Sequence, residues 1–426
     1  MTKCQHLSRV ALIALETTLL CMGLRGTAQF GTDSHKAKLA EQSTVLTFAD
    51  LPAKPPVLQF KPAGPMEVVF SHKRDACNSD DIPDEAAHAF RDAFGEVHLV
   101  ASHHLNLAMT GPDLNHLHRV CNVLYAAGAH DAKPADFDDL GWIESFYTID
   151  GKTIHGIVSM DYHPDRHNIA CGTSPTDAHD CWYSALTQVD STDGGKTFVA
   201  PPPGKKRFIA GAPYQFDPRH TAVTGALVPT QMVPWNGYIY ALFWIAGGRD
   251  QRDGDCLVRT KNPGDPASWR AWDGRGFNAQ FVDPYPTPPA DPAAHTCTPV
   301  GEAKLRAPVR SLLFLPDNKG FVAVMLGDYK VNNKSVPAVI ASTSTDLLHW
   351  SDPVPVIDVP IYKPGGCTTT PHAAVYSFPS VLDPDSPSLN FNTLGTHGYV
   401  YLTRYFYCEG LNRDLVRFPV MVNYAK

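Results

Sequence analysis

An all-β fold built from repeated sheets is predicted by three features of this sequence. First, 37 prolines and 31 glycines are spread through 426 residues, and interior proline opposes long helices because it removes a backbone donor and clashes with the preceding turn. Second, a glycine-containing turn precedes a short apolar or alternating strand five times. Third, no helical periodicity separates these strands. Hydrophobic residues make up 43% of the chain, which is enough for a core.

The five glycine-led strands recur at intervals of roughly 60 to 85 residues. They are Gly95–Val100, Gly151–Val158, Gly237–Phe243, Gly320–Met325 and Gly398–Leu402. Each follows another short strand that ends in a turn, so each pair is predicted to form a hairpin. The preceding strands are His88–Arg91, Ser145–Thr148, Leu227–Val233, Val309–Leu315 and Ala374–Ser380.

A third strand follows most of these hairpins and ends in a polar turn. The examples are Tyr183–Ser191, Cys256–Thr260, Ala338–Ser342 and Asp414–Phe418. Repeated multi-stranded units indicate a radial β architecture, and five of them fit a five-bladed β-propeller of four-stranded antiparallel blades. A pair of β-sandwich domains would not explain the repeated order. The short strand Val68–Ser71 is predicted to complete the last blade.

Three segments make up the predicted domain organisation. Residues 1–28 have the features of a signal peptide, with Lys3 and Arg9 before an apolar run and small residues up to Ala28. Residues 29–66 are polar and proline-containing, and are predicted to be a linker or wrap. Residues 67–426 are predicted to form the single propeller domain. We therefore expect a secreted or periplasmic protein with no membrane attachment after cleavage.

Eight cysteines remain after the signal peptide. An even number in an exported chain predicts disulfides. Pairing between sequence neighbours would link the loops of one rim, although sequence alone leaves the connectivity open. The four neighbour pairs are Cys77 with Cys121, Cys171 with Cys181, Cys256 with Cys297, and Cys367 with Cys408.

Composition and missing motifs exclude several function classes. A formal charge of −7 opposes nucleic-acid binding, which requires a basic face. The sequence contains no GxGxxG or Walker loop, no HExxH motif and no GxSxG elbow, so nucleotide-dependent, zincin and serine-hydrolase mechanisms lack support. No cofactor is expected. A structural or channel Ca²⁺ would suit the acidic rim, but no residue spacing requires a metal.

Two turn motifs resemble those of known propeller families. The run from Ser191 through Asp193, Gly195 and Thr197 to Phe198 matches the Asp-box of sialidase-type propellers, and Ser344–Trp350 is similar to a turn in glycoside hydrolases of the arabinanase and invertase type (families 43 and 32). The resemblance covers about residues 67–424. It implies a five-bladed glycoside hydrolase. Asp193 and Asp346 are expected to close turns, not to catalyse.

Propeller topology predicts where the active site lies. Residues before the first strand and after the second strand of each blade converge on one end of the central channel. A glycosidase needs two carboxyl groups, one ionised and one protonated. We expect Asp84 as base or nucleophile, Glu302 as acid and Asp161 as modulator or partner. Seven residues are expected to bind substrate at this rim, namely Asp81, His103, Tyr162, His163, Arg249, Arg252 and Arg404.

The predicted function is hydrolysis of a plant or microbial poly- or oligosaccharide. The first alternative is a sialidase-like enzyme with a cluster of Arg91, Arg252 and Arg404 and a nucleophile at Tyr405 or Tyr376. The second is a polysaccharide lyase that uses a histidine and a tyrosine, drawn from His103, His163 and Tyr162. The third is a carbohydrate-binding lectin without catalytic acids.

Overall fold

The computed structural model describes residues 51–52, 54–128, 133–172, 181–201, 207–317 and 319–424. All of them belong to one structural unit, which spans Ser43–Lys426. The predicted signal peptide and most of the predicted linker lie outside the described residues. Within them, no helix is long and apolar enough to cross a membrane.

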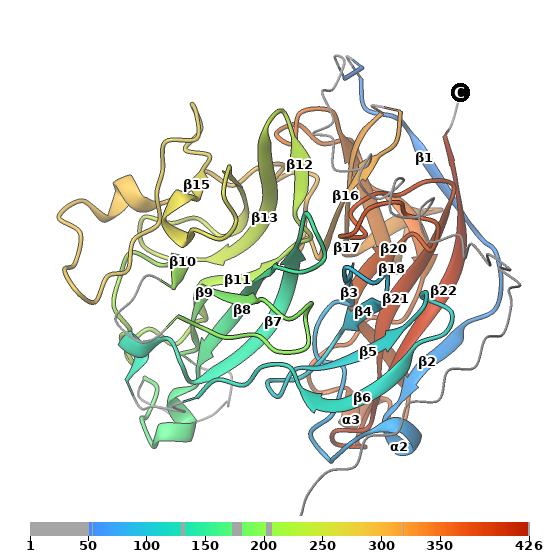
Figure 1. Cartoon of the computed structure of the whole chain (residues 1–426), viewed down its shortest axis with the longest axis horizontal. Helices are drawn as coiled ribbons and strands as arrows, with labels where there is room; N and C mark the ends of the chain where they lie inside the picture. The colour runs from blue at the N-terminus through green and yellow to red at the C-terminus, as the bar shows by residue number, and fades with distance from the viewer. Residues whose placement is uncertain are drawn as a thin grey trace, which may run out of the picture. The chain divides into compact units, whose positions relative to one another are not determined.

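The first sheet contains four antiparallel strands in sequence order (Figure 1). They are β3 (His88–Arg91), β4 (Val97–Val100), β5 (Leu107–Gly111) and β6 (His118–Val123).

A nine-stranded sheet follows, and it consists of two groups. The first group contains β7 (Leu140–Tyr147), β8 (Ile154–Tyr162), β9 (Tyr183–Ser191) and β10 (Phe208–Gly211). The second contains β11 (Thr224–Pro229), β12 (Val233–Trp235), β13 (Tyr238–Ala246), β14 (Gly254–Thr260) and β15 (Arg270–Ala271). A short parallel pairing joins the groups, with Thr224 opposite Tyr183 and Gly225 opposite Ser184. All other strand pairs in this sheet are antiparallel.

The last two sheets are antiparallel. One contains β16 (Ser311–Leu315), β17 (Gly320–Val331), β18 (Lys334–Ser344) and β19 (Val354–Asp358). The other contains β20 (Ala374–Leu382), β21 (His397–Phe406), β22 (Arg413–Tyr424), β1 (Leu58–Pro62) and β2 (Glu67–Ser71). Both β1 and β2 pair with β22. The strand predicted at Val68–Ser71 is therefore present in the last sheet as β2, and the predicted linker contributes a further strand, β1.

Helical structure in the described residues is limited to single turns. These are α2 (His72–Asp75), α3 (Gly366–Thr369), and the 3₁₀ turns η1 (Pro134–Asp136), η2 (Pro164–His167), η3 (Pro266–Ser268) and η4 (Pro292–His295). Proline occupies the start of every 3₁₀ turn, where its missing N–H would have no intrahelical partner anyway. The structure is therefore nearly all-β, as the sequence predicted.

Strands of different groups contact one another: β3 with β7, β7 with β11, β12 with β16, β16 with β20, and β20 with β3. Buried polar side chains join them. Ser145 Oγ donates to the Thr230 carbonyl at 2.7 Å, and Gln231 Nε2 donates to Ser311 Oγ at 3.0 Å. The His88 imidazole contacts the Glu144 carbonyl and lies 2.9 Å from the Arg310 carbonyl. The Ser145 and His88 side chains thus provide hydrogen-bond partners for backbone carbonyl groups of neighbouring strand groups.

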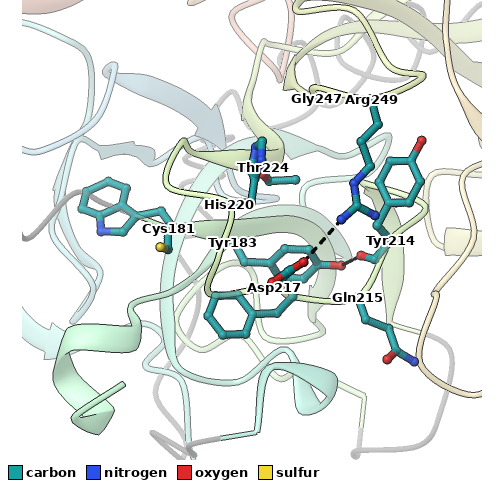
Figure 2. A pocket seen from close by; sticks show the side chains of 11 residues that line it. Cys181, Tyr183, Tyr214, Gln215, Asp217, His220, Thr224, Gly247 and Arg249 are labelled. Carbon is teal, nitrogen blue, oxygen red and sulfur yellow. Dashed lines mark hydrogen bonds and ion pairs between the residues drawn. The ribbon is translucent and has the colours of Figure 1, made fainter. Parts of the chain in front are cut away.

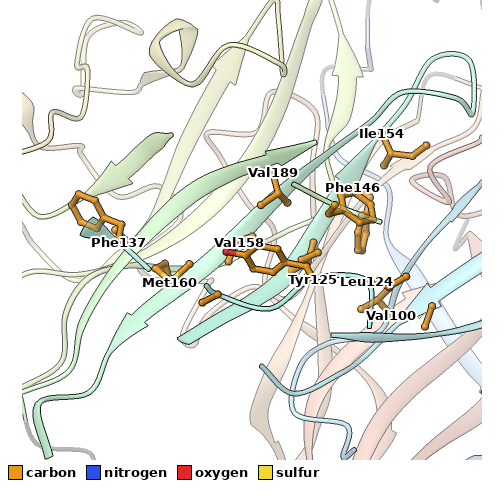
Figure 3. Close-up of a cluster of buried hydrophobic side chains, with 14 of the residues drawn as sticks. Val100, Leu124, Tyr125, Phe137, Phe146, Ile154, Val158, Met160 and Val189 are labelled. Atoms are coloured by element: carbon orange, nitrogen blue, oxygen red, sulfur yellow. The ribbon is translucent and has the colours of Figure 1, made fainter. Parts of the chain in front are cut away.

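Apolar clusters fill the spaces between neighbouring sheets. Figure 3 shows one of them, in which Phe146, Val158 and Val189 of the β7–β10 group meet Val100 of β4 and Leu124, which follows β6. Phe90 and Phe198 belong to the same cluster. Burial of such side chains contributes roughly 1.5–3 kcal/mol each, so packing between sheets holds the groups together.

All four predicted cysteine pairs are bonded: Cys77 with Cys121, Cys171 with Cys181, Cys256 with Cys297, and Cys367 with Cys408. Cross-links of this kind persist in oxidising compartments. The expectation of disulfides between sequence neighbours is confirmed.

Candidate active site

Charged and polar side chains from four of the strand groups lie near the strands through which the groups contact one another. Asp84 and Glu85 precede β3, Glu144 lies within β7, and Asp161 lies near the end of β8. The other members are Arg310, which precedes β16, Tyr405 of β21 and Arg413, which begins β22. Asp84 and Arg310 precede first strands, and Asp161 and Tyr405 lie near the ends of second strands, in agreement with the topology argument. Glu144, in the middle of β7, and Arg413, at the start of β22, lie at positions not included in that argument.

Asp84 is at the solvent-accessible part of this cluster. Its carboxylate accepts a hydrogen bond from Arg413 Nη1, and Asp84 Oδ2 lies 3.7 Å from His103 Nε2. The three side chains keep 18–20% of their surface exposed. Burial raises the pKa of Asp84, while the Arg413 and Arg310 charges act in the opposite direction. Asp84 is therefore an acid that a small ligand could reach, with a pKa that burial raises and that the Arg413 guanidinium partly restores.

Glu85 and Glu144 form a second acidic pair beside Asp84. Arg310 Nη1 lies 3.6 Å from Glu85 Oε2. Burial raises the pKa of both carboxyl groups, with that of Glu144 at about 7, and the Glu144 charge raises the pKa of Glu85 further. Two carboxylates this close cannot both ionise easily, so the pair retains a proton near neutral pH.

Asp161 has no cationic partner in the structure as described. The neighbouring Ser184 and Ser159 hydroxyls favour its ionised form, while burial and the nearby charges of Asp84 and Asp139 disfavour it. Asp161 Oδ1 has no hydrogen-bond partner among the described residues. Its pKa is raised to about 6, chiefly by burial. Asp161 and Asp84 therefore differ in environment, since only Asp84 is paired with arginine.

His103 and Tyr405 flank Asp84. Burial and the Arg413 charge lower the pKa of His103 to about 4, so its imidazole is neutral at pH 7. Arg413 lies over the Tyr405 ring, 4.5 Å from its centroid. Burial first and the Asp84 charge second raise the pKa of Tyr405, which keeps the phenol protonated.

A series of aromatic rings leads away from Asp84. The ring centroids of His103 and Trp142 are 5.7 Å apart, those of Trp142 and His163 are 6.2 Å apart, and those of His163 and Trp182 are 4.1 Å apart. The last two contacts are stacked. Trp142 is buried, whereas His103, His163 and Trp182 are partly exposed, so the last three rings offer aromatic surface that a sugar ring could contact.

Trp182 also lines a solvent-open pocket of about 330 Å³. Figure 2 shows Tyr214, Asp217, His220 and Arg249 around it. Arg249 lies over the Tyr214 ring, 4.6 Å from its centroid, and its Nη2 is 3.6 Å from Asp217 Oδ2. The pocket thus combines aromatic faces with hydrogen-bonding groups at the far end of the ring series.

Five of the predicted site residues belong to this arrangement. Asp84, Asp161 and His103 lie in the charged cluster, His163 belongs to the ring series, and Arg249 lines the pocket. Tyr162 is buried, stacks on His167 and packs edge-to-face against Phe216. The positions fit the predicted rim, and the roles stay predictions.

The structure places the other predicted residues elsewhere. Glu302 is 48% exposed and pairs with Arg252 at 2.9 Å, and no interaction joins it to the Asp84 cluster among the described residues. Asp81 is buried and pairs with Arg119 at 3.2 Å. Arg404 pairs with Asp414 at 2.5 Å. Since neighbouring residues of a strand point to opposite faces, Arg404 points away from Tyr405.

Five members of the cluster are not in the favoured hydrolase site that the sequence predicts: Glu85, Glu144, Arg310, Tyr405 and Arg413. Among them, Tyr405 belongs to the sialidase-like alternative. Glu144 could have been identified from the sequence, because it is a glutamate within the apolar run Leu140–Tyr147. A carboxyl group in such a strand is buried, and a buried carboxyl group needs polar partners. The predicted strand begins at Ser145, whereas β7 begins at Leu140, so Glu144 lies one residue before the predicted strand. Arg413 likewise lies one residue before the predicted strand Asp414–Phe418.

The two motif aspartates close turns, as expected. Asp193 Oδ1 accepts hydrogen bonds from the backbone N–H groups of Lys196 and Thr197, both at 3.0 Å. Asp346 Oδ1 accepts from those of Leu348 and His349, at 2.9 and 2.7 Å. These bonds satisfy the turns and leave both residues outside the charged cluster.

Comparison with known proteins gave structural matches only. No family model and no curated protein sequence matches the chain. Among solved structures, the Cellvibrio cellulosa α-L-arabinanase is 10% identical, with a TM-score of 0.40 and coverage of 79% of this chain and 90% of the arabinanase. A glycosyl hydrolase from Bacteroides ovatus is 11% identical, with a TM-score of 0.40 and coverage of 87% and 92%. An exo-1,5-α-L-arabinanase from a bovine ruminal metagenomic library is 12% identical, with a TM-score of 0.42 and coverage of 81% and 96%. Similarity at this level establishes neither fold nor activity, so the site is interpreted from its own residues.

Proposed function

We propose that the protein is an exported glycoside hydrolase, and that its strand groups form a five-bladed propeller with the active site at Asp84 and Asp161. The observation that carries this proposal is the meeting of two accessible acids from different strand groups in different electrostatic environments. Glycoside hydrolysis uses one ionised and one protonated carboxyl group, and groups whose environments differ in this way are candidates for the two roles.

The roles follow from the partners of each acid. Asp84, hydrogen-bonded to Arg413, is the base or nucleophile. Asp161, with a pKa of about 6 and only hydroxyl partners, is the general acid. The Glu85–Glu144 pair adds negative charge behind them. We do not assign Glu302 the acid role, because its exposed pairing with Arg252 gives no means of keeping it protonated.

The ring series and the pocket around Trp182 support a saccharide with more than one sugar unit. A first sugar would lie at Asp84, and later units would follow Trp142, His163 and Trp182 toward Arg249. The substrate class is a neutral poly- or oligosaccharide of plant or microbial origin. The four disulfides fit secretion or export to the periplasm.

The sialidase-like alternative rests on Tyr405 and two arginines near Asp84. Arg413 and Arg310 are paired with Asp84 and Glu85, so they are not free to bind a substrate carboxylate. The three arginines that the sialidase-like alternative requires do not form a cluster, because each has a different partner. Arg252 pairs with Glu302, Arg404 pairs with Asp414, and Arg91 lies over Phe391. We therefore favour a neutral substrate.

Reducing-sugar release from a panel of neutral polysaccharides, uronate-containing polymers and sialosides tests the proposal. Asp84→Asn and Asp161→Asn should each lower turnover by about 10²–10⁴-fold, whereas the matched variant Glu302→Gln should retain it. Activity of the wild type should fall as pH rises above about 6, because Asp161 loses its proton.

The other outcomes identify the alternatives. Binding of a glycan without turnover indicates a lectin, and unsaturated uronate products indicate a lyase. Sialoside hydrolysis that Tyr405→Phe abolishes indicates the sialidase-like enzyme. Full activity in both Asp84→Asn and Asp161→Asn rejects the proposed pair.

A further inference from the structure

The turn between β3 and β4 holds a group of potential metal ligands outside the charged cluster. Asp92, Glu96 and His98 each offer one ligand atom, and these atoms lie within 4.8 Å of one another. We propose that this turn binds a divalent first-row transition metal ion, such as Zn²⁺ or Mn²⁺, as a structural site. The proposal does not depend on the proposed hydrolase activity.

His98 is the main support for this inference. Its side chain is buried, with 3% of the residue exposed, and neither ring nitrogen has a hydrogen-bond partner among the described residues. Its Nε2 lies 3.8 Å from Asp92 Oδ2, too far for a hydrogen bond. A buried polar group without a partner is unfavourable, and a bound cation would satisfy this nitrogen.

Asp92 is oriented so that one oxygen remains available. Its Oδ1 accepts hydrogen bonds from the backbone N–H groups of Phe94 and Glu96, at 2.8 and 2.9 Å. The other oxygen, Oδ2, faces His98. The backbone bonds fix the carboxylate, as hydrogen bonds to metal-ligating carboxylates commonly do. Glu96 is exposed, so an ion can enter from solvent on its side.

The ligand types select the metal. An imidazole nitrogen with two carboxylate oxygens suits zinc, manganese or iron(II), whereas calcium and magnesium prefer oxygen alone. Three protein ligands leave room for water to complete the coordination. The Lys196 ammonium is close enough to influence His98, and it opposes a bound cation.

A metal here would stabilise contact between strand groups. The Ala93 N–H donates to the Gly151 carbonyl at 2.8 Å, so the β3–β4 turn already bonds to the β7–β8 turn. His98 stacks on Phe90 with a centroid distance of 4.8 Å, and Phe90 belongs to the cluster between the two groups. Fixing His98 would therefore fix the edge of that cluster.

The experiment uses the full chain after EDTA treatment and removal of the chelator. Isothermal titration with ZnCl₂ and with MnCl₂ measures affinity and stoichiometry, and thermal unfolding is recorded with and without each metal. The test variants are Glu96→Gln and His98→Asn. Glu96 is exposed, so its replacement should leave folding intact. His155→Asn is the matched control, because His155 pairs with Asp190 at 2.6 Å without a third ligand.

We expect one saturable site in the wild type and a higher unfolding temperature with metal. Glu96→Gln and His98→Asn should each weaken binding by roughly tenfold or more, since even indirect partners of a metal site contribute that much. His155→Asn should bind normally, and Lys196→Gln should bind more tightly. Absence of saturable binding in the wild type, or wild-type affinity in Glu96→Gln, overturns the proposal.

Discussion

Replacement of Asp255 by asparagine should make the protein less sensitive to rising pH. Asp255 lies in β14 and is buried. Its Oδ1 accepts a hydrogen bond from the Val309 N–H at 3.2 Å, and its Oδ2 has no partner in the described part of the chain. Burial raises the pKa of this carboxyl to about 8, against the opposing effects of the Val309 hydrogen bond and the Arg310 charge.

The direction of the effect follows from proton linkage. In the unfolded chain the Asp255 carboxyl loses its proton near its ordinary pKa of 3.8, whereas in the folded protein it keeps the proton up to about pH 8. Stability contributed by the protonated form is complete below pH 3.8 and is lost as pH rises toward 8. The loss is about 1.4 kcal/mol for each pH unit in this window, or about 3 kcal/mol between pH 5 and pH 7.

Asparagine keeps the carbonyl oxygen for Val309 and does not titrate. Guanidinium unfolding of wild type and Asp255→Asn, with disulfides intact, should be compared at pH 5, 6 and 7. The free energy of unfolding of the variant, relative to wild type, should increase by about 3 kcal/mol across this range.

Asp193→Asn is the control for this measurement. The pKa of Asp193 is lowered to about 2 by hydrogen bonds from Thr197, Ser191 and Lys196, which outweigh its burial. Both its folded and unfolded forms are ionised above pH 5, so its variant should differ from wild type by a constant amount. If Asp255→Asn shows the same constant offset, the assignment of a buried, protonated Asp255 is wrong.

Three further predictions concern the framework. Phe243→Ala should lower the free energy of unfolding by about 3–5 kcal/mol in denaturant titrations, because Phe243 is fully buried in the apolar cluster between the two groups of the nine-stranded sheet. Replacing Cys256 and Cys297 together with alanine should lower it by roughly 2–4 kcal/mol, since the bond closes a loop with a sequence separation of 41; unchanged stability would mean that the loop is already held by its contacts. Gly225→Ala should prevent normal folding, as judged by circular dichroism and solubility, because an added Cβ would lie 1.8 Å from the Ser184 carbonyl oxygen and φ is +118°; a soluble, cooperatively unfolding variant would refute this.

The order of the strands could be predicted from the sequence because it depends on patterns among residues that are close together in the chain. The first strand, His88–Arg91, and the third strand, Tyr183–Ser191, match β3 and β9. Alternating side chains and glycine turns are short-range signals, and the cysteine pairs followed from the same order. Strand ends were less accurate, and this is why Glu144 and Arg413 were missed.

Side-chain grouping at the site was harder to predict because it depends on the twist and length of each loop. Glu302 was selected for its place before the fourth strand group, but the loop that holds it turns the side chain toward Arg252. Arg404 and Tyr405 are adjacent in sequence, yet one pairs with Asp414 and the other lies by Asp84. A one-residue uncertainty in a strand reverses which side chain faces the site.

The pairing of β22 with both β1 and β2 has a consequence for how the chain folds. Leu58 lies opposite Tyr424, and Ser71 lies opposite Asp414, so segments from the two ends of the described chain form one sheet. During synthesis β1 and β2 emerge first and must wait for their partner until β22 has been made. The last sheet therefore forms late, by closing a very long loop, and until then its unpaired edges are open to aggregation.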